Sequence, residues 1–157
     1  MTDNFEKAVD IVLKFEGGYS NNPLDSGGET KYGISKSAYP YLDIATLTLE
    51  KAKAIYYNDY WLRSGAALLP WPLSLIHFDT AVNMGVSRAK SFLDKTQDPS
   101  SYLELRKDYY YKIGNRTFIG GWINRITALQ AYVLAPALIV IALVVFFLIF
   151  LWGFKNK

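Results

Sequence analysis

The chain of 157 residues contains no cysteine. Disulfide bonds therefore neither stabilise this protein nor switch it between states. Histidine is nearly absent as well, because His77 is the only one, and a typical metal site needs more nitrogen or sulfur ligands than that. His77 lies on an apolar helical face and is interpreted as a core residue. The sequence thus predicts neither a metal nor a cofactor.

An excess of one charge is also missing. The chain has 17 Lys and Arg against 14 Asp and Glu. Two of the basic residues, Lys155 and Lys157, follow an apolar C-terminal run, which leaves 17 − 2 = 15 basic against 14 acidic residues before it. No Lys/Arg cluster stands out as a track for phosphates. We therefore expect no nucleic-acid partner.

Charged side chains are absent throughout residues 131–154. About 20 apolar residues that rise about 1.5 Å each would span a hydrocarbon layer of about 30 Å. Tyr132 and Trp152 would lie near its two faces, where interfacial aromatic residues are common. The run predicts one transmembrane helix over 131–154 in contact with membrane lipid. Its orientation stays open, because basic residues flank both ends.

The rest of the chain has the pattern of a small, mainly helical domain. Apolar residues recur at helical spacing from Phe5 to Phe15, and Gly17-Gly18 is expected to end this first helix. This amphipathic start lacks the apolar stretch of a cleavable signal peptide. Residues 19–34 are rich in Gly, Asn, Ser and Asp, which predicts turns with a short hairpin. Further helices are expected from Thr48 toward Trp61 and over 72–84, 87–95 and 100–113.

Carboxylates and a hydroxyl gather around the predicted hairpin. Glu16 ends the first helix, and Asp25 and Thr30 follow it. The negative end of a helix dipole and apolar neighbours such as Phe15 both disfavour a charged carboxylate, which suits a general acid. Asp25, in a Gly/Ser-rich turn, would remain ionised. Such a pair is typical of glycoside hydrolysis. The alternative is that Glu16 is a surface residue and Asp25 only a turn residue.

Five segments carry a resemblance to a known family: Glu16–Tyr19, Asp25–Ile34, Tyr60-Trp61, Phe78–Gly85 and Gly121–Arg125. Together they are similar to glycoside hydrolase family 108, the N-acetylmuramidases that include phage endolysins and bacterial secretion-activator proteins. The resemblance covers roughly residues 5–128. It implies a lysozyme-like α+β fold and attack on the β-1,4 bond between N-acetylmuramic acid and N-acetylglucosamine in peptidoglycan.

The same resemblance implies roles for individual residues. Glu16 matches the catalytic acid of the family. The order of Glu16, Asp25 and Thr30 also resembles the triad of phage-type lysozymes, so Asp25 and Thr30 are expected to position the water. Tyr19, Tyr32, Trp61 and Asn83 are candidate contacts to the glycan strand. Each has an alternative role, as a core aromatic residue or, for Asn83, as a helix cap.

The expected fold is α+β and mainly α, a lysozyme-like domain with a small β-hairpin plus one C-terminal transmembrane helix. The boundaries are a catalytic region over 1–90, a helical peptidoglycan-domain-like region over 91–130 packed on it, and the membrane helix over 131–154. The expected function is a membrane-anchored phage endolysin at the bacterial inner membrane, single-pass, acting on periplasmic peptidoglycan. Two alternatives stay open: a holin-like membrane protein with a vestigial hydrolase domain, and a wall-remodelling muramidase that serves secretion.

Overall fold

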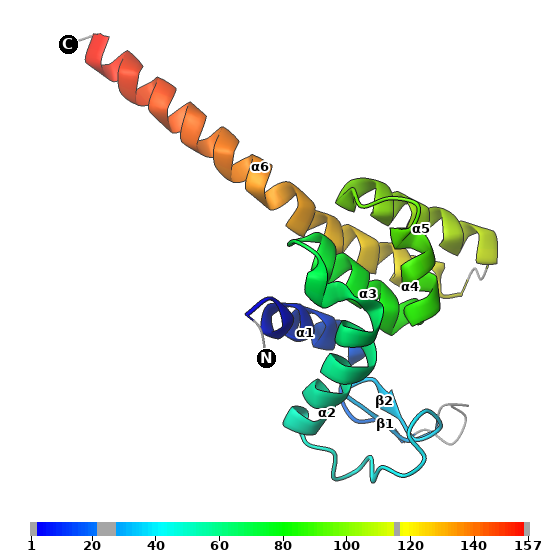
Figure 1. Ribbon diagram of the computed structural model, residues 1–157. Coiled ribbons are helices and arrows are strands. Elements are labelled where there is room, and N and C mark those ends of the chain that lie inside the picture. Colours follow the sequence, from blue (N-terminus) through cyan, green and yellow to red (C-terminus); the bar gives the residue numbers. More distant parts are fainter. Residues whose placement is uncertain (1–2, 22–27, 115–116, 156–157) are drawn as a thin grey trace. The chain divides into compact units, whose positions relative to one another are not determined.

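The chain forms two compact units, Met1–Asp98 and Pro99–Lys157 (Figure 1). The computed structural model describes residues 3–21, 28–114 and 117–155, except for the side chains of 136, 137, 140 and 148–155. The first unit contains a small sheet and several helices, and the second consists of two helices.

The first unit begins with α1 (Asp3–Glu16), an amphipathic helix. Its apolar residues recur every three to four positions, which places them on one face. The buried side chains on this face are Phe5, Ala8, Val9, Ile11 and Val12. Gly17, directly after the helix, has a φ of +73°, a left-handed conformation that glycine adopts without a side-chain clash. The expected first helix and its glycine end are confirmed.

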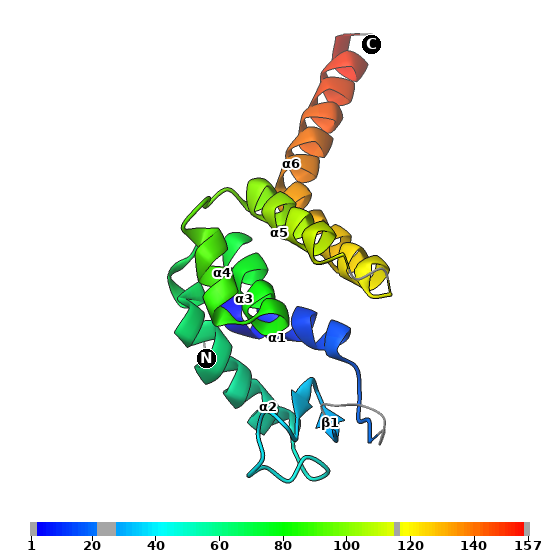
Figure 2. The ribbon, with the colours of Figure 1, turned by 90° about the vertical axis from the view of Figure 1, so that its right-hand side faces the viewer.

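A short antiparallel hairpin follows, formed by β1 (Thr30–Lys31) and β2 (Ile34–Ser35). Thr30 pairs with Ser35, and Ser20 extends the sheet on the other side of Thr30 through two backbone hydrogen bonds of 2.8 Å. Figures 1 and 2 show the hairpin at the same end of this unit as the next helix, α2 (Leu49–Ile55). The small β element expected before residue 35 is confirmed.

The helix that starts at α2 changes its geometry midway. Thr48 caps it, because its Oγ1 accepts a hydrogen bond from the Lys51 backbone N–H at 3.3 Å. After Ile55 the chain continues as η1 (Tyr56–Leu62), a π-helical segment, and η2 (Ala66–Leu68) is a short 3₁₀ turn. The sequence predicted one regular helix toward Trp61. Its apolar spacing did not reveal the wider turns of η1, which occur frequently at functional sites.

The core of the first unit lies around α3 (Leu73–Met84), which is buried from Leu73 to Ala81. The ring of Phe78 contacts Trp61 edge-to-face at 5.4 Å between centroids, and contacts Phe5 at 5.9 Å. Each such aromatic pair contributes about 0.5–1.5 kcal/mol beyond the area that it buries. The cluster joins η1 and α3 to α1 through Phe5, near the N-terminal end of that helix.

The last helix of this unit, α4 (Val86–Leu93), packs against α3. Ala89 and Phe92 supply its buried face. In Figures 1 and 2 these two helices lie at the end of the unit opposite the hairpin and α2. The first unit is thus a helical core with a small β element at one end, the α+β arrangement that fits a lysozyme-like domain.

The second unit pairs α5 (Pro99–Ile113) with α6 (Ile119–Lys155). Arg106 is buried, and its Nε donates a hydrogen bond to the Tyr110 hydroxyl at 3.0 Å. The Tyr110 ring stacks on Trp122 with 4.7 Å between centroids and an interplanar angle of 18°. Because the stacking links one helix to the other, it anchors the beginning of α6 to α5.

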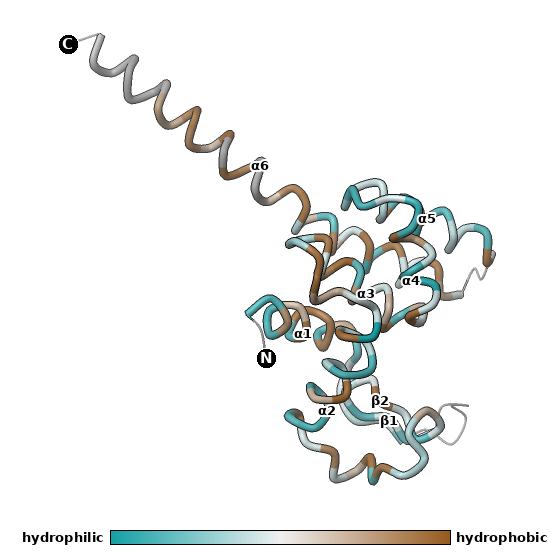
Figure 3. Tube along the Cα trace, viewed as in Figure 1, coloured by the Kyte–Doolittle hydropathy of each residue, from teal (hydrophilic) through white to brown (hydrophobic). Residues whose placement is uncertain are grey.

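The apolar C-terminal run is part of α6 and continues a helix that begins at Ile119. Figure 3 shows its apolar colouring, and the large apolar side chains described between Leu138 and Phe147 are 48–70% exposed. Yet among the residues that the structure describes, no helix combines the length and the apolar character that crossing a membrane requires.

The predicted transmembrane helix over 131–154 is therefore wrong, and with it the single-pass inner-membrane localisation. The prediction treated the apolar run as a separate element. In the folded chain the run belongs to a longer helix whose first turns carry polar side chains, including the buried Arg125, and pack on α5. The membrane-lipid partner and the holin-like alternative depended on the same prediction.

Candidate active site

Glu16 is the last residue of α1, and its side chain is partly buried. Phe15, which the sequence suggested as an apolar neighbour, is 36% exposed. Glu16 contacts the hairpin turn. A Cβ atom built on Gly33 would lie 2.8 Å from Glu16 Oε2, so the carboxyl group lies directly against the Gly33 backbone.

The hairpin turn can approach Glu16 because of its two central residues. Tyr32 and Gly33 have φ angles of +53° and +75°, the combination typical of a tight type I′ turn. Gly33 has no side chain at the point where Glu16 and the Tyr56 hydroxyl meet the turn, and a Cβ there would lie 2.5 Å from Tyr56 Oη. The close approach therefore requires glycine at position 33.

Tyr56 completes this arrangement from η1. Its side chain is buried, and its hydroxyl donates a hydrogen bond to the Tyr32 carbonyl oxygen at 2.8 Å. Three elements thus meet at one point: the end of α1 with Glu16, the hairpin turn, and the first residue of η1. Neither Gly33 nor Tyr56 was singled out from the sequence. The only signal was the Tyr-Gly pair inside the run of turn residues, which predicts a turn but not its neighbours.

Asp25 and Thr30 are the two residues expected to act with Glu16. Asp25 lies outside the described residues. Thr30 is the first residue of β1, and its hydroxyl donates a hydrogen bond to the Gly28 carbonyl oxygen at 3.1 Å. The backbone of Thr30 is held on both sides, by Ser20 and by Ser35. Thr30 therefore belongs to the same hairpin whose turn contacts Glu16.

The aromatic residues proposed to contact sugar differ in exposure. Tyr19 is 52% exposed and donates a hydrogen bond to Glu29 Oε1 at 2.7 Å, and this bond raises the pKa of the Tyr19 hydroxyl. Tyr32 is partly buried, with Lys31 Nζ 5.7 Å from the centre of its ring. Both lie near the hairpin. Trp61, in contrast, is only 1% exposed and packs in the aromatic core.

Asn83 is exposed near the C-terminal end of α3, two residues before Gly85. His77, on the same helix, is buried, and its Nε2 lies 3.1 Å from the Ser64 carbonyl oxygen. Burial lowers the pKa of His77, so the imidazole is held neutral in the core. Among the described residues no group of three or more His, Cys, Asp or Glu side chains is arranged to hold a metal ion.

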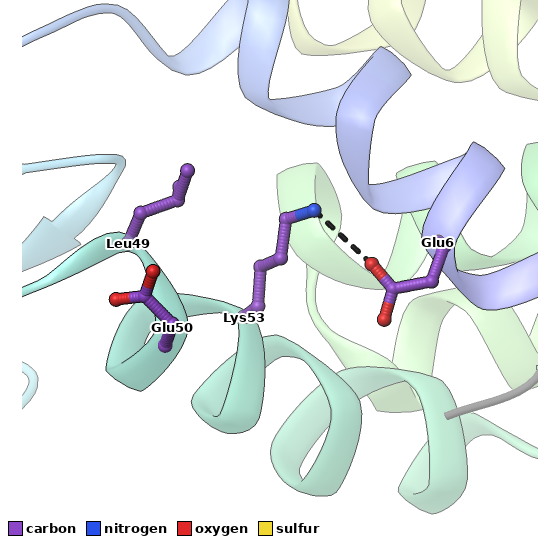
Figure 4. A pocket seen from close by; sticks show the side chains of 4 residues that line it. All are labelled: Glu6, Leu49, Glu50 and Lys53. Atoms are coloured by element: carbon purple, nitrogen blue, oxygen red, sulfur yellow. Dashed lines mark hydrogen bonds and ion pairs between the residues drawn. The ribbon is translucent and has the colours of Figure 1, made fainter.

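A pocket of about 300 Å³ on the first unit is lined by Glu6, Leu49, Glu50 and Lys53 (Figure 4). Lys53 Nζ lies 3.1 Å from Glu6 Oε2 and 2.7 Å from Asp10 Oδ1, and the hydrogen bond to Asp10 is the main reason why the pKa of Lys53 is raised. Since both carboxylates belong to α1, this cluster ties α2 to α1.

A second pocket, of about 420 Å³, is lined by residues after β2, on η1 and at the start of α4: Ala38, Tyr39, Asp59, Tyr60, Arg63 and Val86. The Tyr39 hydroxyl donates a hydrogen bond to Asp59 Oδ2 at 2.8 Å. Burial raises the pKa of Tyr39, and hydrogen bonds with Asp59 and Tyr60 act in the same direction. This cluster could not be predicted from the sequence, because its members are far apart in the chain.

Comparison with known proteins places this geometry in a chemical class. Residues 9–85 match the model of the family described as Glycosyl hydrolase 108. The fold is similar to "Structure of Brucella abortus SagA", with a TM-score of 0.72 and 27% sequence identity, over 84% of this chain and 94% of that one. A search of curated proteins gave no match.

The protein is a glycoside hydrolase. More narrowly, the match over 9–85 and the structural likeness support the resemblance to glycoside hydrolase family 108 and a peptidoglycan-hydrolysing function of the muramidase type. The matched stretch includes Glu16, the hairpin, η1 and all of α3, so it covers the whole arrangement around Glu16.

Proposed function

We propose that this protein is an N-acetylmuramidase of the endolysin kind, which hydrolyses the β-1,4 bond between N-acetylmuramic acid and N-acetylglucosamine in peptidoglycan. The observation that carries the proposal is the position of Glu16. Its carboxyl group ends α1 and lies against the Gly33 backbone beside the Tyr56 hydroxyl. A carboxyl group held in one position can protonate the leaving oxygen of a glycosidic bond.

In the proposed reaction Glu16 protonates the glycosidic oxygen as the bond from that oxygen to the anomeric carbon of the muramic acid residue breaks. Asp25 stabilises the positive charge that develops on the sugar or accepts a proton from the attacking water. The water oxygen forms the new bond to the anomeric carbon, and Thr30 helps to position it. The products are a new reducing end on muramic acid and a free hydroxyl on the leaving sugar.

The hairpin supports this assignment of roles. Thr30 is fixed in the sheet by backbone hydrogen bonds to Ser20 of 2.8 Å, and Gly33, in the turn that follows β1, contacts Glu16. A catalytic group on a hydrogen-bonded strand is held more precisely than one on an open loop. Tyr19 and Tyr32 flank this element, and their rings are proposed to pack on the sugar units beside the cleaved bond.

The test is hydrolysis of purified peptidoglycan by the full chain and by its Glu16→Gln variant, with product ends identified by mass spectrometry. We expect reducing muramic acid ends from the parent. Loss of the general acid should lower the rate by about 10²–10⁴-fold, the usual contribution of such a group. Glu50→Gln is a matched control, because it removes an exposed carboxylate on α2 of the same unit.

Two results would contradict the proposal. A folded parent that releases only N-acetylglucosamine reducing ends would cleave the other glycosidic bond. A Glu16→Gln variant as active as Glu50→Gln would remove Glu16 from the acid role. Circular dichroism of both variants shows whether they retain the helical fold.

A further inference from the structure

The pocket of about 420 Å³ beside η1 brings several polar side chains together. It contains two tyrosines, one carboxylate and one guanidinium group, namely Tyr39, Asp59, Tyr60 and Arg63. Asp59 and Tyr60 lie on the π-helical segment, and Arg63 follows directly after it. The wider turns of η1 thus bring three polar groups to one wall.

A contact between two tyrosine rings links the pocket to the arrangement around Glu16. The Tyr60 ring, which lines the pocket, lies 5.7 Å from the Tyr56 ring between centroids. The hydroxyl of Tyr56 lies at Gly33, where Glu16 Oε2 also lies. Tyr60, which lines the pocket, and Tyr56, which contacts the hairpin turn beside Glu16, therefore lie close together on η1.

The polar groups of the pocket are of two kinds. Tyr39 donates to Asp59 Oδ2 at 2.8 Å, which fixes the carboxylate in one orientation and leaves its other oxygen as an acceptor. Arg63 is exposed, and its guanidinium makes no hydrogen bond or ion pair with any residue that the structure describes. A fixed acceptor and an available fork of donors thus lie in the same pocket.

These groups favour a neutral, hydroxyl-rich ligand over an ion. Asp59 and Arg63 carry opposite charges, so the pocket has no net charge that would select an anion or a cation. Neighbouring hydroxyl groups on a sugar ring can donate to the carboxylate and accept from the guanidinium, and hydrogen bonds to charged groups are the stronger ones. The C–H face of the ring can pack on a tyrosine. A volume of about 420 Å³ accommodates one sugar unit.

We propose that this pocket is a subsite for one uncharged N-acetylhexosamine unit of a glycan strand, held by Asp59 and Arg63 at a position separate from the bond that Glu16 cleaves. The assignment to a glycan strand rests on the proposed muramidase function. The subsite would increase affinity for longer strands without entering the chemistry, so its loss should affect KM and not kcat.

The experiment measures binding without hydrolysis. A tetramer of N-acetylglucosamine is titrated calorimetrically into the full-chain Glu16→Gln protein, alone and combined with Arg63→Gln or Asp59→Asn. We expect each pocket variant to raise the Kd about tenfold, the effect of losing one hydrogen bond to a charged group. Arg88→Gln is the matched control, an exposed arginine on α4 outside the pocket. It should leave the Kd unchanged.

A second experiment measures the hydrolysis of uncross-linked peptidoglycan strands by proteins that retain Glu16. Arg63→Gln should raise KM about tenfold with kcat within about twofold of the parent. Asp59→Asn keeps an acceptor for the Tyr39 hydroxyl, so its fold is preserved and the same split between KM and kcat is expected. A merely structural role would change the melting temperature and kcat instead, and this result would overturn the subsite.

The two proposals fail in different ways. Peptidoglycan hydrolysis with an unchanged Kd and KM in Arg63→Gln and Asp59→Asn would overturn the subsite and leave the muramidase intact. Tetramer binding that depends on Arg63 in a protein that cleaves no peptidoglycan would retain the sugar pocket and reject the muramidase. An effect of Arg63→Gln restricted to fragments with a free muramic acid carboxylate would overturn the uncharged ligand.

Discussion

At the residue scale, Gly33 determines whether the hairpin can contact the candidate acid. Two requirements coincide there: a φ of +75°, and no side chain between the turn and the groups that meet it. The second requirement is specific to this site. Gly65 has a similar φ of +88°, but a Cβ on it would meet nothing within 4 Å. A comparison of substitutions at Gly33 and Gly65 therefore separates the effect of backbone strain from the effect of displacing Glu16 and Tyr56.

We therefore expect Gly33→Ala to impair both stability and catalysis. Alanine in the left-handed region costs about 1–2 kcal/mol, and at position 33 its Cβ must also displace Tyr56 Oη and the Glu16 carboxyl group. The rate of peptidoglycan hydrolysis should fall at least about tenfold, because small displacements of a catalytic group are costly. Urea unfolding and turnover measure the two effects.

Gly65→Ala is the control for this prediction. It introduces the same backbone strain where the space is open, so it should lose about 1–2 kcal/mol of stability and retain the parent rate. Equal rates for Gly33→Ala and Gly65→Ala would show that the contact between the hairpin turn and Glu16 does not matter for catalysis.

At the element scale, the elements that local signals define could be predicted, and those that depend on packing could not. The end of α1 followed from Gly17-Gly18, and the hairpin from a stretch of turn residues. The position of Glu16 at a helix end was therefore predictable. Its neighbours Gly33 and Tyr56 were not, because they lie 17 and 40 residues further along the chain and only the tertiary fold brings them to Glu16.

The π-helical segment η1 illustrates the same limit. Its apolar residues keep roughly helical spacing, so the sequence predicted an ordinary helix toward Trp61. The wider turns and the buried position of Trp61 against Phe78 depend on the core formed with α1 and α3. The candidate pocket of Tyr39, Asp59 and Arg63 was missed for this reason, since it combines η1 with a loop and with the start of α4.

The buried helix α3 carries a titratable group whose effect on stability can be measured. Burial lowers the pKa of His77 below its usual value of 6.5. As the pH falls below about 6.5, the unfolded chain binds a proton at this position before the folded chain does. The stability that neutral His77 contributes is therefore fully present above pH 6.5, and it is lost as the pH falls toward the folded-state pKa.

We expect the single histidine to titrate below pH 6.5 in the folded protein, observed by NMR through its ring carbon-bound protons. The free energy of unfolding in urea should fall between pH 7 and pH 5.5, and a His77→Gln variant should lose the part of this fall that belongs to the imidazole. A midpoint at or above 6.5 would contradict a neutral core histidine.

At the scale of the whole molecule, the second unit combines a packed segment with an exposed one on a single helix. In α6 the residues that contribute to the core, such as Ile126 and Leu129, lie in its first turns, near the stacking of Trp122 on Tyr110. Beyond Leu134 the large apolar side chains that the structure describes are exposed. The apolar run was evident from composition, but its continuity with the packed first turns of α6 was not.

This division predicts different effects of two truncations. A chain that ends at Gln130 retains Trp122, Ile126 and Leu129, so the unfolding transition of α5 should resemble that of the full chain. A chain that ends at Phe118 lacks all three. Burial of Ile126 and Leu129 alone is worth about 1.5–3 kcal/mol each, and without it α5 should lose protection from hydrogen exchange.

The same pair of chains tests the consequence of the exposed apolar surface. Contiguous exposed apolar side chains promote association in water, so sedimentation velocity should show the full chain in larger assemblies than the chain that ends at Gln130. Both should have the same hydrogen-exchange protection in α5. If instead α5 exchanges equally fast in the chains that end at Gln130 and at Phe118, the exposed distal half of α6 stabilises the second unit, and the packed first turns do not suffice to hold its two helices together.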